Sequence, residues 1–493
     1  MSTERKRATM ASVVLGVVGV AFIWQSFAAV NPNLQGDLNG DNKVTIADLS
    51  ILLSNFNKTG DTADLNGDGK VTIADLSILL SNWGKTYSGG GTTPPPTTPP
   101  PTTPPPTTPP TTPPTPVPPT AGQPTVKIDG KDYPNPLTLK NGQPVSTKAI
   151  WESQRRAELL QDFRQNVYGF IPEPTNVTFD VKPTTSGSNV RKNVTINYTG
   201  PNGSGSFPIR VFIPKSEAKP KGTFVIIDHR NNGSDDFNQN SDYMPIAKLL
   251  QNGYAVAPIN VGNDVAADGG GYRDKVISKM IGADKDNAAR AIGAWSWAAM
   301  RAMDYLQTDT DIDPKKVAVI GHSRSGKASL WAGAQDTRFA AVISNDSGST
   351  GAKLARRGDG GVGGETVQRI NDSFPHWFPQ TYKAYNNKVD SLPVDQHELI
   401  ALVAPRRAIV ASATDDGNAD PQGEFLSYVN ATPVYSLYGY GNNGLGGKGW
   451  RPDTGKNYRG DAMSYFLRAG GHGLTGQEWN AYMTGDIFSP GPP

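Results

Sequence analysis

The sequence predicts an α/β fold, in which a mostly parallel sheet is covered by helices on both faces and is preceded by a small all-α module. Three observations support this. From residue 124 onward, short β-branched runs alternate with helical stretches. An acidic loop occurs twice before them, with a period of 27 residues, and a Thr/Pro tract separates the two regions. We therefore expect an N-terminal segment (1–30), a repeat module (34–86), a Pro/Thr-rich linker (87–123) and a main domain (124–493).

The first 30 residues have the features of an export signal. Three basic residues at positions 5–7 precede an apolar stretch over 13–24, and Ser26-Phe27-Ala28 offers a small-x-small cleavage site. Residues 11–29 carry no charge, so the alternative is a retained membrane anchor. In both cases we expect the rest of the chain to be extracellular, either secreted or held at the cell surface.

The composition excludes several classes of function. The chain has no cysteine, which excludes disulfides, thiol catalysis and cysteine-ligated zinc. Its formal net charge is only +2, which argues against a nucleic-acid partner because phosphate binding needs clustered basic residues.

Each copy of the repeat has the oxygen spacing of an EF-hand-type loop, which predicts Ca²⁺ binding. Asn42 and Gly69 fall at the sixth loop position, where a sharp turn is needed. The twelfth position is Asp rather than the usual Glu. The expected ligands are Asp37, Asn39, Asp41, the Lys43 carbonyl, Thr45 and Asp48 in the first loop, and Asp64, Asn66, Asp68, the Lys70 carbonyl, Thr72 and Asp75 in the second.

One amphipathic helix is expected after each loop. Tandem loop–helix units of this kind, over residues 36–85, resemble dockerin domains. The resemblance implies Ca²⁺-dependent folding and docking onto a cohesin-type receptor; the alternative is a calcium-stabilised spacer without a partner. The residues expected on the shared helical face are Leu49, Leu52, Leu53 and Phe56, repeated as Leu76, Leu79, Leu80 and Trp83.

In the main domain, apolar β-branched runs predict buried strands, and longer periodic stretches predict helices. The expected strands are 223–227, 255–259, 316–320, 340–344 and 408–411, and the expected helices are 288–306, 326–335 and 395–402.

Ser323 is the candidate nucleophile. It lies in Gly321-His-Ser-Arg-Ser-Gly326, between an expected strand and an expected helix. This is the nucleophile-elbow arrangement of α/β-hydrolases, although the second glycine comes three positions after the serine rather than two. Arg324 and Lys327 fall in the first turn of the helix, where the dipole disfavours cations, which suggests a role toward oxygen-rich ligands or a developing oxyanion.

The candidate base is His472. Hydrolases of this fold place the histidine after the serine, which leaves three of the five histidines. His397 falls in an apolar helical stretch and His376 in an apolar loop, so both are expected to be structural. His472 lies in a Gly-rich loop, which suits a residue that takes and returns a proton.

Two positions are open for the acid that orients the base. Asp416, or Asp415, follows the strand 408–411, and Asp346 follows the strand 340–344. Either position could hold the imidazole tautomer, and position alone does not choose between them.

The segment Gly321–Lys327 is similar to the nucleophile motif of glucuronoyl esterases, carbohydrate esterase family 15, most like the bacterial branch. The likeness extends over further segments, among them Ala294–Trp297, Ile343–Gly348, Gly364–Val367 and Ser373–Phe378.

The resemblance implies Ser323 as nucleophile, His472 as base, and Asp346 as acid with Asp416 as support or substitute. It implies that Arg324 stabilises the oxyanion. The implied substrate-binding residues are Lys327 and Glu365, which contact glucuronic acid hydroxyls, with Trp377 and Asn418; Asn418 stands where bacterial relatives often carry Trp.

The expected activity is hydrolysis of the ester between 4-O-methyl-glucuronic acid of glucuronoxylan and lignin alcohols, through an acyl-enzyme and without a cofactor in the catalytic site. The alternatives are an acetyl-xylan or feruloyl esterase, and a non-catalytic glycan-binding module.

Overall fold

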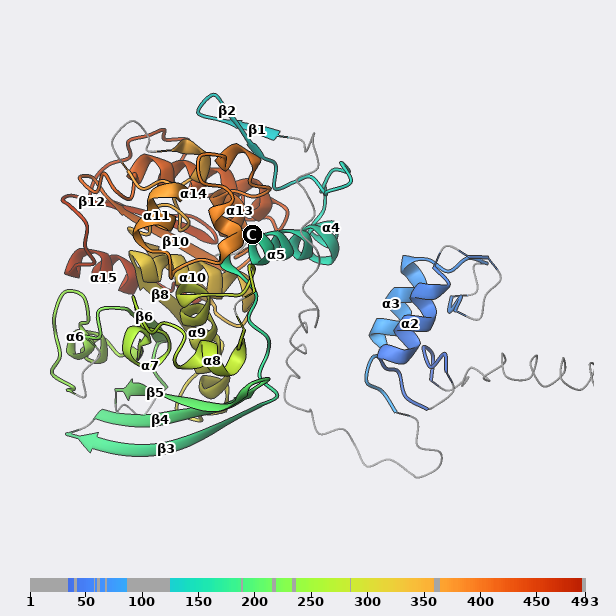
Figure 1. The fold of residues 1–493 in the computed structure, drawn as a ribbon, viewed down its shortest axis with the longest axis horizontal. Coiled ribbons are helices and arrows are strands. Elements are labelled where there is room, and N and C mark those ends of the chain that lie inside the picture. The colour runs from blue at the N-terminus through green and yellow to red at the C-terminus, as the bar shows by residue number, and fades with distance from the viewer. Residues whose placement is uncertain are drawn as a thin grey trace, which may run out of the picture. The chain divides into compact units, whose positions relative to one another are not determined.

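The chain forms two compact units, Met1–Pro105 and Pro106–Pro493 (Figure 1). The structure is a computed structural model that describes residues 34–39, 42–56, 58–59, 63–66, 69–86, 125–187, 189–214, 219–232, 236–283, 285–358 and 364–489. The expected export segment 1–30 and linker 87–123 lie outside these residues. Within the described part, no helix is both long and apolar enough to cross a bilayer.

The first unit is built from two identical helices, α2 (Ile46–Ser54) and α3 (Ile73–Ser81). Leu52 and Leu79, at equivalent positions, are fully buried between them, whereas Leu53 and Leu80 are half exposed. The leucines therefore divide between a small core and the surface, rather than sharing one face. The core residues are Leu34, Leu38, Val44, Leu52, Ala63, Val71 and Leu79.

The second unit contains a ten-stranded sheet with the order β11-β12-β10-β9-β8-β6-β7-β5-β4-β3. Its six central strands are parallel and almost entirely buried, as expected for a sheet covered on both faces. This confirms the predicted fold class. The parallel strands are β6 (Thr223–Asp228), β7 (Ala255–Asn260), β8 (Val317–His322), β9 (Ala341–Asn345), β10 (Arg407–Ala413) and β12 (Met463–Arg468).

Antiparallel strands extend the sheet at both edges. One edge carries a short strand, β11 (Asn457–Arg459), and the other a long three-stranded ribbon, at the lower edge of the domain in Figure 1. The ribbon was not predicted, because its polar Asn, Thr and Lys positions interrupt the apolar runs. It consists of β3 (Asn176–Ser186), β4 (Asn189–Gly200) and β5 (Gly203–Ile213).

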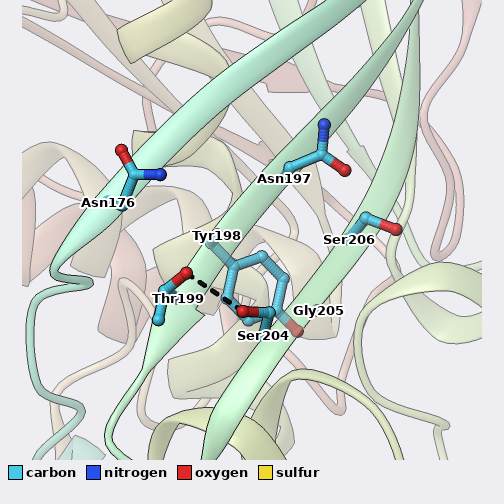
Figure 2. A pocket seen from close by; sticks show the side chains of 7 residues that line it. All are labelled: Asn176, Asn197, Tyr198, Thr199, Ser204, Gly205 and Ser206. Atoms are coloured by element: carbon cyan, nitrogen blue, oxygen red, sulfur yellow. Dashed lines mark hydrogen bonds between the residues drawn. The ribbon is translucent and has the colours of Figure 1, made fainter.

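The ribbon carries a shallow hollow (Figure 2). Tyr198 lies across Gly205, where a Cβ atom would come within 2.4 Å of the tyrosine oxygen. A larger side chain at position 205 would therefore require the Tyr198 ring to shift. The lining residues are Asn176, Asn197, Tyr198, Thr199, Ser204, Gly205 and Ser206.

Helices cover both faces of the parallel sheet. Alternate residues of β6 enter different cores: Val225 and Ile227 pack in the larger cluster, and Phe224 and Ile226 in the smaller one. The larger cluster includes α5 (Arg156–Phe163), α9 (Ala291–Thr308), α10 (Arg324–Gln335), α13 (Gln396–Ala401) and α14 (Pro421–Ser436); the smaller includes α6 (Ile246–Gln251) and α15 (Gly476–Met483). The shorter elements are β1 (Thr125–Ile128), β2 (Lys131–Pro134), α4 (Lys148–Ile150), α7 (Val261–Asp264), α8 (Val276–Met280), α11 (Val367–Ser373) and α12 (Gln380–Lys383).

Candidate active site

Ser323 occupies a strained turn between β8 and α10. Its φ and ψ angles are 58° and −129°, and its N–H donates to the Asn345 carbonyl at 2.9 Å. The two flanking glycines have no room for a side chain: a Cβ atom at Gly321 would lie 1.9 Å from the Ser325 carbonyl oxygen, and one at Gly326 would lie 2.8 Å from Ser347 Cβ. This packing holds a positive φ at a non-glycine residue, and it places the half-buried serine at the N-terminus of α10.

Ser325 stands where a second glycine of the usual motif would be. The residue is fully buried. Its Oγ atom donates to the His322 carbonyl at 2.8 Å, accepts from the His322 N–H at 3.2 Å, and lies 3.0 Å from His229 Nδ1. These bonds close the turn from within, so Ser325 and His229 support the elbow. Sequence reasoning missed both residues.

His472 pairs with Asp416. Its Nδ1 atom lies 2.6 Å from Asp416 Oδ2, and the other Asp416 oxygen accepts the Ala419 N–H at 3.1 Å. The Asp416 side chain is 2% exposed and that of His472 is 41% exposed. Because a carboxylate accepts hydrogen bonds, Nδ1 carries the proton and Nε2 is free to take one. Asp415 is exposed, and its carboxylate instead accepts from the Thr414 hydroxyl.

Asp346 lies beside this pair without bonding to the imidazole. One of its oxygens accepts the Gly473 N–H at 3.2 Å and faces Arg468 at 3.5 Å, and the other has no partner. Burial, with the nearby carboxylates of Glu424 and Asp416, raises the pKa of Asp346 well above its ordinary value. The preference for Asp346 as the main orienting acid does not match this bonding, because the turn after β9 aims Asp346 at the backbone of the loop that carries His472.

The serine turn and the histidine loop meet at one edge of the sheet. His322, which directly precedes Ser323, places its ring 4.5 Å from the ring of His472 between centroids. The Nδ1 atom of His322 lies 2.6 Å from the Asn345 side-chain oxygen, and burial lowers the pKa of His322 well below its ordinary value. The base therefore packs against a neutral imidazole.

Arg324 lies over an aromatic pair beside the turn. Its guanidinium carbon is 4.7 Å from the Trp377 ring centroid and 5.2 Å from that of Phe374. One terminal nitrogen donates to Asp268 at 2.5 Å, whereas the buried Nε atom has no hydrogen-bond partner. Arg324 thus keeps a fixed and uncommitted donor near Ser323.

Lys327 is already saturated. Its ammonium donates to the carbonyls of Ser347 and Ser349, at 2.7 and 2.6 Å, and to Glu365 at 3.0 Å. Because an ammonium has three protons, a bond from Lys327 to a substrate hydroxyl requires one of these to break. In this arrangement, Lys327 orients Glu365.

Trp377 is covered rather than open to a ligand. The residue is 2% exposed, its ring stacks on Phe374 with centroids 3.8 Å apart, and its Nε1–H donates to Asp268 at 2.7 Å. The half-buried Phe374 therefore replaces Trp377 as the aromatic residue that faces the adjoining hollow. That hollow is lined by Glu365, Arg369, Ile370, Ser373, Phe374 and Asn418.

Comparison with known proteins identifies the family of this chain. The family "Glucuronyl esterase, fungi" matches residues 196–439. "Carbohydrate esterase MZ0003", from an unknown prokaryotic organism, is 37% identical over 386 residues, which cover 71% of this chain and 88% of that protein. The chain belongs to carbohydrate esterase family 15.

Members of this glucuronoyl esterase family with known structures share its fold. The glucuronoyl esterase from Solibacter usitatus superposes with a TM-score of 0.64 and 33% identity, covering 73% of this chain and 98% of that one. A 4-O-methyl-glucuronoyl methylesterase of Schizophyllum commune is 31% identical over 323 residues, 63% of this chain and 74% of that protein.

The repeat module of this esterase matches the family "Dockerin type I domain" over residues 35–82. Its two loops have the same hydrogen bonds. Asp48 accepts the backbone N–H groups of Leu38, Asn39 and Thr45 at 2.7, 3.0 and 2.8 Å. Asp75 accepts from Leu65, Asn66 and Thr72 at 2.7, 3.0 and 2.7 Å. Burial alone would raise the pKa of Asp75, but these bonds hold it below its ordinary value.

The sixth position of each dockerin loop makes the expected turn. Asn42 and Gly69 have φ angles of 63° and 92°, and their N–H groups donate to Asp37 and Asp64 at 2.8 and 2.7 Å. In each loop, the carboxylates at positions one and twelve therefore accept hydrogen bonds from the backbone of the same loop. This arrangement of oxygen atoms fits a hard cation. The expected ligands Asp41 and Asp68 lie outside the described residues.

Proposed function

We propose that this family 15 enzyme hydrolyses the ester between 4-O-methyl-glucuronic acid of glucuronoxylan and a lignin alcohol. The observation that carries the proposal is the meeting of the Ser323 turn and the His472–Asp416 pair at one sheet edge, next to Arg324 and Glu365. The similarity to 4-O-methyl-glucuronoyl methylesterases supports the substrate class.

In the first half of the reaction, Ser323 Oγ attacks the uronoyl carbonyl carbon while His472 Nε2 takes the hydroxyl proton. The tetrahedral intermediate collapses, the alcohol leaves with the proton from His472, and an ester of Ser323 remains. A water molecule then attacks this ester while His472 takes one of its protons, and His472 returns that proton to the Ser323 oxygen as the bond between Ser323 and the acyl group breaks. The products are the free uronic acid and the regenerated serine.

The protein groups around these atoms have separate roles. Asp416 keeps the His472 proton on Nδ1 and stabilises the imidazolium that forms. Arg324, with nearby backbone N–H groups, stabilises the oxyanion; one such donor contributes about 2.7–4 kcal/mol to transition-state binding in comparable sites. Asp346 holds the loop that carries His472, through the Gly473 N–H.

The hollow beside Glu365 is the proposed site of the sugar ring. Glu365, oriented by Lys327, accepts from sugar hydroxyls, and Phe374 supplies an apolar face. The exposed Asn418 borders the same hollow and offers amide hydrogen bonds where a tryptophan would have offered a ring.

The test compares a benzyl ester of glucuronic acid with a xylose acetate and methyl ferulate, all given to the full chain. We expect turnover of the uronate ester to exceed that of the other two, and Ser323→Ala to abolish it with an unchanged melting temperature. Preferred cleavage of acetate or ferulate would assign another carbohydrate esterase activity, and glucuronoxylan binding without any turnover would assign a binding module.

We further propose that both dockerin loops bind Ca²⁺ and that the module docks onto a cohesin-type receptor. Each loop would hold the ion through its carboxylates, its Asn and Thr oxygens and one backbone carbonyl. The half-exposed side chains at equivalent positions of the two repeats form a duplicated apolar surface, which supports docking. These are Leu53 and Phe56 in the first repeat, and Leu80 and Trp83 in the second, with exposures of 53, 36, 51 and 38%.

A cohesin panel tests this docking proposal directly. We expect the full chain to bind at least one cohesin in Ca²⁺ and to lose that binding in EDTA. A module that folds with Ca²⁺ yet binds no cohesin would be a spacer.

We also propose export of the chain through the 1–30 segment, with the module at 34–86, the linker at 87–123 and the esterase domain at 124–493; N-terminal sequencing of the secreted protein tests the cleavage.

A further inference from the structure

Asp268 connects three side chains of the candidate site. Its Oδ2 atom accepts from Arg324 at 2.5 Å, and its Oδ1 atom accepts from Trp377 Nε1 at 2.7 Å and pairs with His376 Nε2 at 2.9 Å. Asp268 lies in the loop after α7, and the other three residues come from α10 and from the loop before α12. One carboxylate thus joins three segments that are distant in sequence.

The chemistry of these contacts shows that Asp268 is ionised. Burial alone would raise the pKa of Asp268, but the hydrogen bonds from His376 and Trp377 and the charge of Arg324 hold it far below its ordinary value. A carboxylate can only accept, so His376 donates from Nε2. Asp268 therefore has a full negative charge and no hydrogen of its own to offer Arg324.

The helix α9 fixes both sides of this arrangement. Trp295 Nε1 donates to the Ala266 carbonyl at 2.8 Å, which anchors the loop of Asp268. The first N–H groups of α9, from Ala291 and Ile292, donate to the carbonyls of His376 and Trp377 at 3.1 and 3.3 Å. The carboxylate is therefore held between two anchored loops, and it is not free to follow Arg324 if the guanidinium turns.

The consequence for Arg324 is a single orientation. One end of its guanidinium is held by Asp268, and one face lies over the Trp377 ring, whose own N–H is bonded to the same carboxylate. The Nε–H is buried without a partner, and the side chain as a whole is 28% exposed. The guanidinium carries five N–H groups, and only one of them bonds to Asp268, so exposed terminal N–H groups are left for a substrate or an oxyanion.

We propose that Asp268 is a positioning residue of this esterase, which aims Arg324 so that a terminal N–H group of its guanidinium meets the oxyanion formed on the attack of Ser323. The inference rests on the proposed acyl-enzyme chemistry and goes beyond it by naming what makes Arg324 effective. Because the aim matters most when negative charge develops, Asp268 affects kcat rather than KM.

The experiment is a double-mutant cycle with Asp268→Asn and Arg324→Gln in the full chain. Asp268→Asn keeps the shape but removes the charge, and we expect it to lower kcat by about 10- to 100-fold while KM stays within about 3-fold. Combined with Arg324→Gln, it should add less than about 2-fold, because both changes remove the same function. The matched control is Asp274→Asn, an exposed acid of the same loop, which should keep kcat within about 2-fold.

Independent losses that multiply in the double variant would show that Asp268 does not act through Arg324, and an unchanged kcat for Asp268→Asn would also overturn the proposal. If Asp268→Asn does not fold, Arg324→Ala is assayed with added guanidinium. We expect saturable recovery of kcat, because Asp268 and Trp377 remain as a cradle for the cation; no recovery overturns the proposal.

The double-mutant cycle and the rescue assay are run on benzyl glucuronate and on an activated aryl acetate. If only the acetate is cleaved, in a reaction that depends on Ser323, the proposed uronate specificity fails while the role of Asp268 is still tested.

Discussion

Asp416 Oδ2 lies 2.6 Å from Nδ1 of His472, whereas Asp346, which is also buried, accepts the neighbouring Gly473 N–H instead. A carboxylate oxygen of Asp346, a carboxylate oxygen of Asp416 and a ring nitrogen of His472 lie within 4.8 Å of one another. The two carboxylates therefore share one small region but have different partners, and their substitutions should differ.

Asp416→Asn should lower kcat by about 10³–10⁴-fold, because an amide can donate to the imidazole and so stabilise the wrong tautomer. Asp346→Asn should cause a much smaller loss, because the amide oxygen can still accept the Gly473 N–H and only the charge opposite Arg468 is removed. Steady-state kinetics of both variants on a glucuronate ester measures this, with melting curves as the control for folding. The reverse order would make Asp346 the orienting acid.

Glu365→Ala should raise KM for a glucuronate ester by about 10-fold, because one buried hydrogen bond to a sugar hydroxyl is lost. The same variant should leave the kinetics on a small aryl acetate unchanged, because the acetate has no sugar ring. Glu152→Ala, an exposed acid far from the site in sequence, is the control. An equal effect on both substrates would place Glu365 outside sugar recognition.

Gly326→Ala should destabilise the esterase domain by about 1–3 kcal/mol, because the new methyl group would lie 2.8 Å from Ser347 Cβ. Gly321→Ala should be worse, since its clash at 1.9 Å is with backbone. Gly449→Ala, where nothing lies within 4 Å of the added atom, is the matched control. Urea unfolding measures all three, and equal stability of the three variants would contradict the packing around the turn.

Burial lowers the pKa of His229 to about 3, below its ordinary value near 6.5. The neutral form is thus favoured in the folded state, so its contribution to stability is present above pH 6.5 and is lost as the pH falls toward 3. Between pH 6 and 4, the wild type should therefore lose about 1.4 kcal/mol per pH unit more than His229→Asn. Parallel stability curves for the two proteins would mean that His229 is protonated in the folded state.

Removal of Ca²⁺ should unfold the dockerin module without inactivating the esterase. Hydrogen exchange of the full chain should show protection of α2 and α3 in Ca²⁺ and its loss in EDTA, because the inward carboxylates repel one another without the cation. Asp75→Ala should remove protection from the second repeat at Ca²⁺ levels that still protect the first. Equal protection in EDTA would show that the apolar core alone folds the module.

The parallel strands were predictable because a strand buried on both faces is a continuous apolar run, as in Phe224–Ile227. The ribbon β3–β5 was not, because only alternate positions such as Val194 and Ile196 face the core. The predicted start of a helix was one residue early where a capping residue precedes the first turn. The expected helix 395–402 begins at Gln396, because Asp395 is its N-cap.

In the site, Ser323 could be predicted from the glycine spacing around it, and His472 could be predicted because the histidine follows the serine along the chain in hydrolases of this fold. The choice between Asp346 and Asp416 could not, because it depends on how two loops fold back on the His472 loop. Asp268 had no signal at all: it stands in a Gly-rich loop without periodicity, and its importance comes only from partners more than 50 positions away.

The exposure of His472 has a consequence for the size of the molecules that can be processed. An imidazole that is 41% exposed, on a loop at the rim of the sheet, is reached directly from bulk solvent. An ester bond in the middle of a long polymer can therefore reach Ser323 directly from solvent. Neither end of the polymer has to enter the site first.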